Sequence, residues 1–85
     1  MQPTPGAMIT DALRRGGLTL DDLAQSTRLR GSLLEQMQAD DFSDTGGDVY
    51  ARGHLRVIAG VLDIDAACLL AAYDEASTLR RPPAP

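Results

Sequence analysis

The sequence predicts an all-α fold, a compact bundle of five helices that contains a helix-turn-helix. Apolar residues recur at spacings of three and four through most of the chain, which is the period of a helix with one buried face. No segment shows the sustained alternation of apolar and polar residues that indicates a strand. The 85 residues suffice for a single domain, and 44% of them are hydrophobic, which is enough for a small packed core.

The two ends of the chain differ in composition from its middle. Residues 1–6 contain two prolines and a glycine, and we expect a flexible N-terminus there. Residues 78–85 include the run Arg-Arg-Pro-Pro-Ala-Pro, which cannot continue a helix and indicates an extended tail or the start of a linker. The folded helix-turn-helix domain is therefore expected over residues 7–77.

The first two helices have clear boundary signals. One helix is expected over residues 7–15, because a pair of glycines follows it and ends it. The next is expected over residues 20–26. Thr19 is a good N-cap for this helix, and Asp22 stands three residues later, where it completes a capping box.

The remaining three helices follow at short intervals. A third helix is expected over residues 30–39. Phe42 comes after it as the only phenylalanine, and we expect this ring to fill the core beneath the following loop. The fourth helix is expected over residues 48–62. Asp65 is placed as the N-cap of a fifth helix over residues 66–76.

The chain is acidic, with a formal net charge of -4, and all eight of its basic residues are arginine. Domains that bind DNA usually carry a basic surface, because neutralising the phosphates supplies much of their affinity. The overall charge therefore disfavours DNA as a partner, although a local basic patch could act against it.

The second and third helices have the length and separation of a helix-turn-helix. In a DNA-binding protein of this type, the outward face of the third helix meets the base edges. The residues placed to contact DNA are Arg28, Arg30, Ser32 and Gln36. Nearby acidic residues would repel the phosphates, and they are Glu35, Asp40 and Asp41. We therefore favour a solvated structural face, with sequence-specific DNA binding by a soluble transcriptional regulator as the alternative function.

The fourth helix has two apolar stripes, whereas a helix packed on one side needs only one. At about 100° per residue, one stripe comprises Ala51, Leu55, Ile58 and Leu62, and we assign it to the core. The second stripe comprises Tyr50, His54, Val57 and Val61. It is either buried by the fifth helix or exposed as a binding surface, and the pattern leaves both interpretations open. Arg52 and Arg56 occupy the remaining face, where they would supply rim charges facing an acidic partner.

Residues typical of catalytic and metal sites are scarce. His54 and Cys68 are the only histidine and the only cysteine, so neither an intrachain disulfide nor a cysteine-rich metal site is expected. Cys68 lies among apolar residues, and we expect it in the core. The sequence contains no phosphate-binding glycine loop and no recognisable pair of nucleophile and base. We therefore expect no enzymatic activity and no cofactor.

Four strings of the sequence are typical of one protein family. The most specific is Val-Tyr-Ala-Arg-Gly-His-Leu-Arg at residues 49–56. It is accompanied by Leu-Asp-Ile-Asp at residues 62–65, by the segment at residues 69–75 and, upstream, by the helix-turn-helix string at residues 17–24. Together they resemble the N-terminal cytoplasmic domain of the RodZ-like proteins over nearly the whole predicted domain.

The resemblance implies a five-helix, repressor-like fold that is used for protein recognition. RodZ proteins carry this domain at the inner face of the cell membrane. There it binds the actin-like filament protein MreB and helps to organise cell-wall elongation and cell shape. Two aromatic side chains on the family's fourth helix contact MreB, and they match Tyr50 and His54 here. His54 replaces an aromatic residue, and Ile58 stands where the family often has tyrosine. The implied partner is therefore MreB or another cytoplasmic protein, with any membrane anchor in a segment outside this chain.

Overall fold

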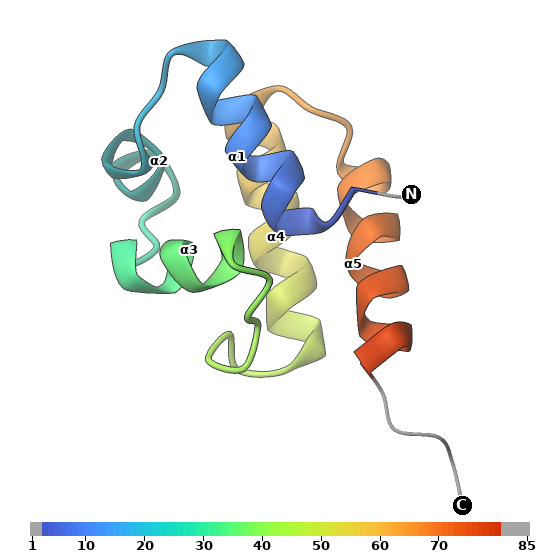
Figure 1. Cartoon of the computed structure of the whole chain (residues 1–85). Helices are drawn as coiled ribbons and strands as arrows, with labels where there is room; N and C mark the ends of the chain where they lie inside the picture. Colours follow the sequence, from blue (N-terminus) through green and yellow to red (C-terminus); the bar gives the residue numbers. More distant parts are fainter. Residues whose placement is uncertain (1–2, 81–85) are drawn as a thin grey trace, which may run out of the picture.

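The computed structural model describes residues 3–80, with side chains up to residue 77, and is shown in Figure 1. This part of the chain forms five helices and no strand, which confirms the predicted all-α fold. The helices are α1 (Pro5–Gly16), α2 (Leu20–Thr27), α3 (Gly31–Gln38), α4 (Asp48–Leu62) and α5 (Ala66–Arg80). The outer parts of the two predicted tails, residues 1–2 and 81–85, lie outside the described residues.

Two helices extend more than one residue further than predicted. α1 begins two residues early because Thr4 is its N-cap and Pro5 stands in the first turn, where a backbone N–H has no helical partner to lose. Pro5 and Gly6 are buried, so these residues of the predicted flexible N-terminus belong to the packed structure. At the other end, α5 includes residues 78–80 of the predicted tail, because the first proline of the tail comes only after Arg81.

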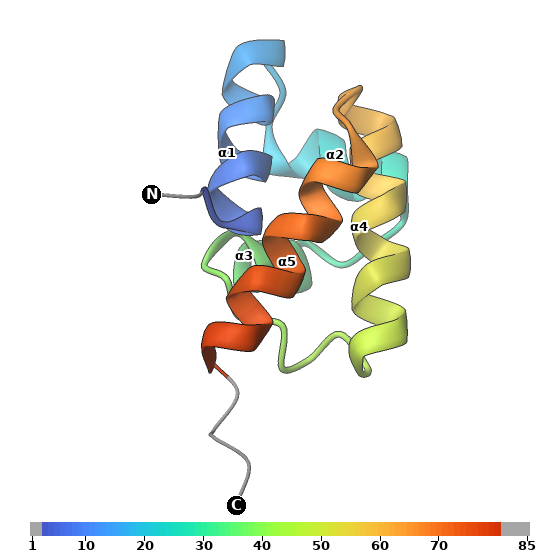
Figure 2. The same ribbon diagram turned by 90° about the vertical axis from the view of Figure 1, so that its right-hand side faces the viewer.

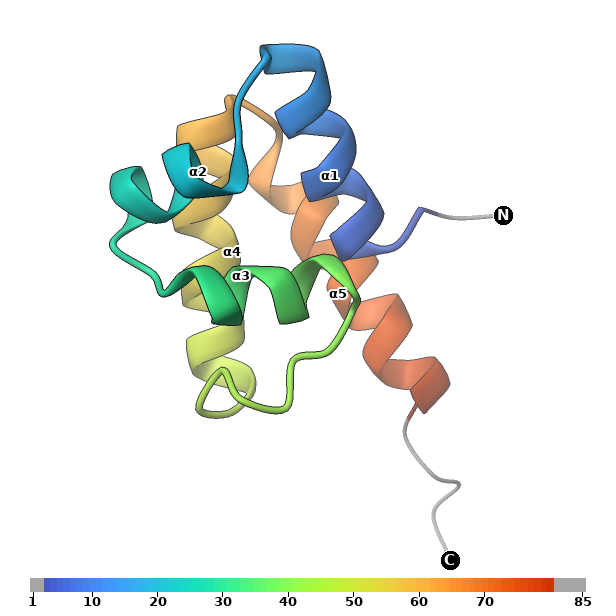
Figure 3. The ribbon, with the colours of Figure 1, turned by 60° about the vertical axis from the view of Figure 1, so that its left-hand side comes forward.

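The helices form two layers. The three longer helices α1, α4 and α5 all contact one another, and Figure 2 shows α5 lying across α1 and α4. The short helices α2 and α3 are joined by residues 28–30 and lie on the side of α1 and α4 that is away from α5 (Figure 3). They form the predicted helix-turn-helix, in which α2 packs against α4 and α3 packs against α1.

The core lies between these layers and receives side chains from every helix. Its largest fully buried apolar side chains include Ile9, Leu23, Leu34, Met37, Leu55, Ile58 and Leu69. The first apolar stripe of α4 is part of this core, as predicted. Ala51, Leu55 and Ile58 are buried, and Leu62 is half-buried at the end of the helix.

One prediction for a core residue is confirmed and another is wrong. Phe42 packs against the core, and its ring lies 5.0 Å from the ring of Tyr73, edge to face. Cys68, however, is exposed. It comes one position before the buried Leu69 and therefore points about 100° around α5 from the residue that faces the core.

Candidate functional site

The second apolar stripe of α4 (Tyr50, His54, Val57 and Val61, here called the outer stripe) is largely open to solvent. Tyr50 is 63% exposed, Val57 is 48% exposed and Val61 is 37% exposed, while His54 is half-buried. The interpretation in which the fifth helix covers this stripe is therefore wrong. Exposed apolar residues that are contiguous on one helix are typical of an interaction surface.

The outer stripe stays open because α5 packs against the other flank of α4. Arg52 marks this flank: its Nε donates to Asp48 Oδ2 at 2.9 Å, and its Nη1 donates to Asp74 Oδ2 of α5 at 3.3 Å. The Tyr73 hydroxyl, also from α5, donates to Asp48 Oδ1 at 3.0 Å. Arg52 lies roughly 170° around α4 from the centre of the outer stripe, by the 100° that separates successive residues.

Arg52 therefore already has partners within the fold. Its guanidinium lies 5.6 Å from the centre of the Tyr73 ring. The hydrogen bonds to Asp48 and then to Asp74 raise the pKa of Arg52 further above its ordinary value, so its charge is permanent. Arg56 is exposed and follows one turn later. Of the two arginines predicted to face a partner, Arg56 is thus the more available.

The pole of α4 that faces away from the core carries one charged residue, the exposed Arg56. It holds Val49, which is 78% exposed, and the glycines Gly53 and Gly60. An exposed helix pole normally carries charged or polar residues, which keep it in water. Sequence analysis did not single out these three residues. Their signal is the scarcity of polar residues around them, since Asp48 and Arg52 lie on the flank that faces α5 and only Arg56 stands nearby.

The loop before α4 supports the position of Tyr50. Thr45 is buried, and its hydroxyl donates to the carbonyl of Phe42 at 2.9 Å. Gly46 and Gly47 have φ values of 94° and 113°, which favour glycine, and a Cβ at Gly46 would lie 3.5 Å from the ring of Tyr50. The start of α4, and with it the first residue of the outer stripe, is therefore held by a defined turn.

The residues considered for DNA binding lie together at the helix-turn-helix. Arg28, Arg30 and Ser32 are exposed, and Arg28 has the left-handed φ of 62° that ends α2. Gln36 is half-buried, and its Nε2 donates to Asp44 Oδ2 at 2.9 Å. A carboxylate therefore stands against the side chain that would read a base edge, which adds to the unfavourable charge of this face.

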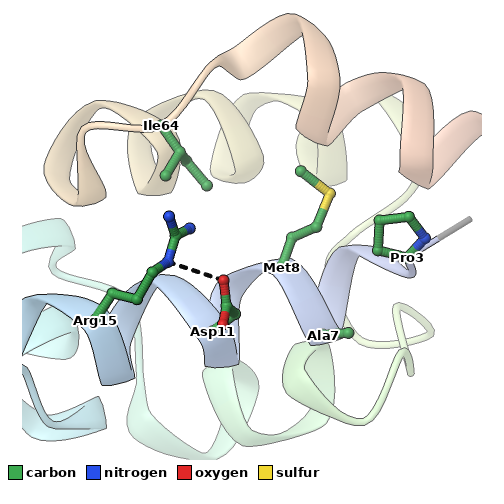
Figure 4. A pocket seen from close by; sticks show the side chains of 6 residues that line it. All are labelled: Pro3, Ala7, Met8, Asp11, Arg15 and Ile64. Carbon is green, nitrogen blue, oxygen red and sulfur yellow. Dashed lines mark ion pairs between the residues drawn. The ribbon is translucent and has the colours of Figure 1, made fainter.

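A separate groove of about 340 Å³ runs along α1 and below the turn between α4 and α5 (Figure 4). Its walls are mostly apolar, with Met8 and Ile64 facing each other across it. Asp11 and Arg15 form an exposed ion pair at 2.9 Å on one wall. Neither here nor elsewhere among the described residues do three or more His, Cys, Asp or Glu side chains gather as metal ligands. The groove does not adjoin any predicted site residue.

Comparison with known proteins gives a family match and one curated relative. The model of a helix-turn-helix domain family matches residues 13–69, from the end of α1 into α5. The chain is 34% identical over 76 residues to a protein named cytoskeleton protein RodZ from Streptococcus pneumoniae (strain ATCC BAA-255 / R6). The match covers 89% of this chain but spans only 28% of that protein. No solved structure matches the chain. Among the described residues, none of the helices is both long enough and apolar enough to cross a bilayer.

Proposed function

This chain belongs to the helix-turn-helix domain family and is RodZ-like, and we propose that it is a protein-binding adaptor for the bacterial cytoskeleton. Its partner is the actin-like filament protein MreB. In the full-length protein it works at the cytoplasmic face of the cell membrane, where it links a membrane-anchored protein to the filament. Through that link it contributes to the control of cell shape and cell-wall elongation, without a catalytic step of its own.

The exposure of the outer stripe carries this proposal. A helix that already contributes a complete inner stripe to the core has no folding reason to expose a tyrosine and two valines in a row. Tyrosine is among the residues that most often dominate binding energy at protein interfaces. The resemblance to RodZ-like domains also implies that Tyr50 and His54 contact MreB. We assign the apolar centre of the contact to the outer stripe, with Arg56 at its rim.

The replacement Tyr50→Ala tests this assignment. Because Tyr50 is exposed, the variant keeps the melting temperature of the wild type, but it loses about 2 kcal/mol of binding energy, or roughly thirtyfold in Kd. Binding is measured by calorimetry with the purified MreB of the source organism. The variant Leu18→Ala is the matched control, since Leu18 is also an exposed large apolar residue but lies outside α4.

Two outcomes would reject the assignment. Unchanged affinity of Tyr50→Ala would mean that the outer stripe does not contact MreB. A large fall in the melting temperature would mean that Tyr50 supports the fold and that its exposure has another cause.

A charge reversal tests the rim of the surface separately. Arg56→Glu slows association with MreB and weakens the dependence of binding on salt, because rim charges act mainly through long-range attraction. Arg52 is engaged with α5, so its replacement affects stability before it affects binding. Stopped-flow association at several salt concentrations separates the two arginines. Equal association rates for Arg56→Glu and wild type would remove Arg56 from the contact.

A further inference from the structure

Gly53 and Gly60 are unexpected residues within α4. Glycine is, after proline, the least favourable residue in a helix interior. Neither glycine has a positive φ, so neither is needed for an unusual backbone conformation. A Cβ atom added at either position would meet no other atom within 4 Å. The packing of the domain therefore gives no reason for glycine at these two positions.

The two glycines share one place on the surface of α4. They are seven residues apart, so they lie roughly 20° from each other around the helix and about two turns apart along it. Val57 lies between them in sequence and belongs to the outer stripe. The glycines thus extend the outer stripe toward the outward pole of α4, where Arg56 is their one charged neighbour.

We propose that Gly53 and Gly60 are specificity-determining residues of the MreB contact, an inference that rests on the proposed function. Without side chains, they allow a backbone segment of MreB to lie directly against α4, beside Tyr50 and Val57. Close backbone approach is a recurring use of glycine, because a single Cβ atom would hold the two surfaces apart. Close contact at these positions then favours a partner whose backbone can lie against α4.

The size of this face argues against a stable dimer of the chain held through α4 alone. α4 has 15 residues and is therefore about 22 Å long and about 10 Å wide. One face of it offers on the order of 200 Å², whereas a stable interface buries about 800 Å² on each side. A pair of α4 helices packed on each other would therefore bury too little surface, and the contact with MreB must include elements beside α4.

The test is a double variant, Gly53→Ala with Gly60→Ala, titrated with purified MreB beside the wild type. Its affinity falls roughly tenfold or more, because two methyl groups separate packed surfaces. Its melting temperature stays the same or rises, because alanine favours the helix. Gly31→Ala is the matched control: Gly31 begins α3, it is exposed, and an added Cβ also meets no atom within 4 Å. This control binds like the wild type.

Each contrary result has its own meaning. Unchanged affinity of the double variant, together with weak binding by Tyr50→Ala, would reject the role of the glycines and leave the proposed function intact. A lower melting temperature would show that the fold itself requires the glycines. A wild-type dimer in sedimentation that the double variant loses would assign the face to a second copy. No binding by the wild type would reject both the proposed function and this inference.

Discussion

Tyr73 is the residue through which α4, α5 and the preceding loop are joined. It is only 6% exposed, its ring meets Phe42 edge to face, and its hydroxyl donates to Asp48 at 3.0 Å. The replacement Tyr73→Phe keeps the ring contacts and removes the hydrogen bonds of the hydroxyl with Asp48 and Ser77. We expect it to lower the free energy of unfolding by about 1 kcal/mol, measured by urea denaturation. A variant as stable as the wild type would show that the hydrogen bonds of this hydroxyl contribute nothing to stability.

Tyr73 also predicts a response to alkaline pH. Burial, and then the hydrogen bond to the Asp48 carboxylate, raise the pKa of Tyr73 above its ordinary value of about 10. Because the folded-state pKa is raised, the stabilisation is present below about pH 10 and is lost as the pH rises through the folded-state pKa. Unfolding measured from pH 8 to pH 11 should therefore show a steeper loss for the wild type than for Tyr73→Phe. Parallel profiles for the two proteins would contradict this.

At the residue scale, sequence patterns predict which face of a helix is apolar or charged, but not which neighbouring element packs against that face. The outer stripe was recognised from its spacing, with both burial and exposure left open. The sequence predicts that Arg52 faces a partner, whereas in the fold it bonds to Asp48 and Asp74. These bonds could not be predicted, because they depend on where α5 lies. Cys68 was assigned to the core from its apolar neighbours, although the next residue is the one that faces inward. Contacts between helices therefore set the limit of these predictions.

At the scale of elements, the start of α2 was fully predictable because it depends on local sequence. Thr19 and Asp22 form the expected capping box, with hydrogen bonds of 3.1 Å and 2.9 Å in the two directions. Thr19→Ala should cost about 1 kcal/mol of stability, measured by thermal or urea unfolding. Thr19→Ser, which retains the hydroxyl, is the control and should remain close to the wild type. Equal stability of all three proteins would mean that the cap does not support the helix-turn-helix.

The contact between α1 and α3 could not be predicted, because it joins residues far apart in the sequence. The Gly6 N–H donates to Asp40 Oδ1 at 2.8 Å, and a Cβ at Gly6 would overlap the backbone carbonyl of Gln38. Gly6→Ala should therefore destabilise the domain by about 2 kcal/mol, because backbone atoms must move apart. Gly31→Ala provides the comparison, since an added Cβ there meets open space. Equal melting temperatures for the two variants would contradict the close approach.

At the scale of the whole molecule, one arrangement decides which surface is free for a partner. α5 covers the flank of α4 that carries Arg52, and α2 packs against α4 from the other layer. The outer stripe lies outside both contacts and is left exposed. The number and order of the helices followed from hydrophobic periodicity and capping residues. The exposure of the outer stripe did not, since it depends on how α5 docks.

At the scale of the whole molecule, the net charge of -4 predicts weak binding to DNA. Binding to nonspecific duplex DNA should stay undetectable at physiological salt, because too few arginines are grouped at the helix-turn-helix to offset its acidic residues. An electrophoretic shift at low salt that disappears steeply with added salt and requires Arg28 and Arg30 would support the DNA-binding alternative instead.

The most direct test of the central claim is an NMR titration of the isotopically labelled domain with purified MreB, run beside a titration with duplex DNA. The adaptor function predicts that MreB perturbs the signals of α4 around Tyr50, Gly53 and His54, and that DNA perturbs none. Perturbation of α3 by DNA, with α4 unaffected by MreB, would contradict it and show that this helix-turn-helix binds DNA.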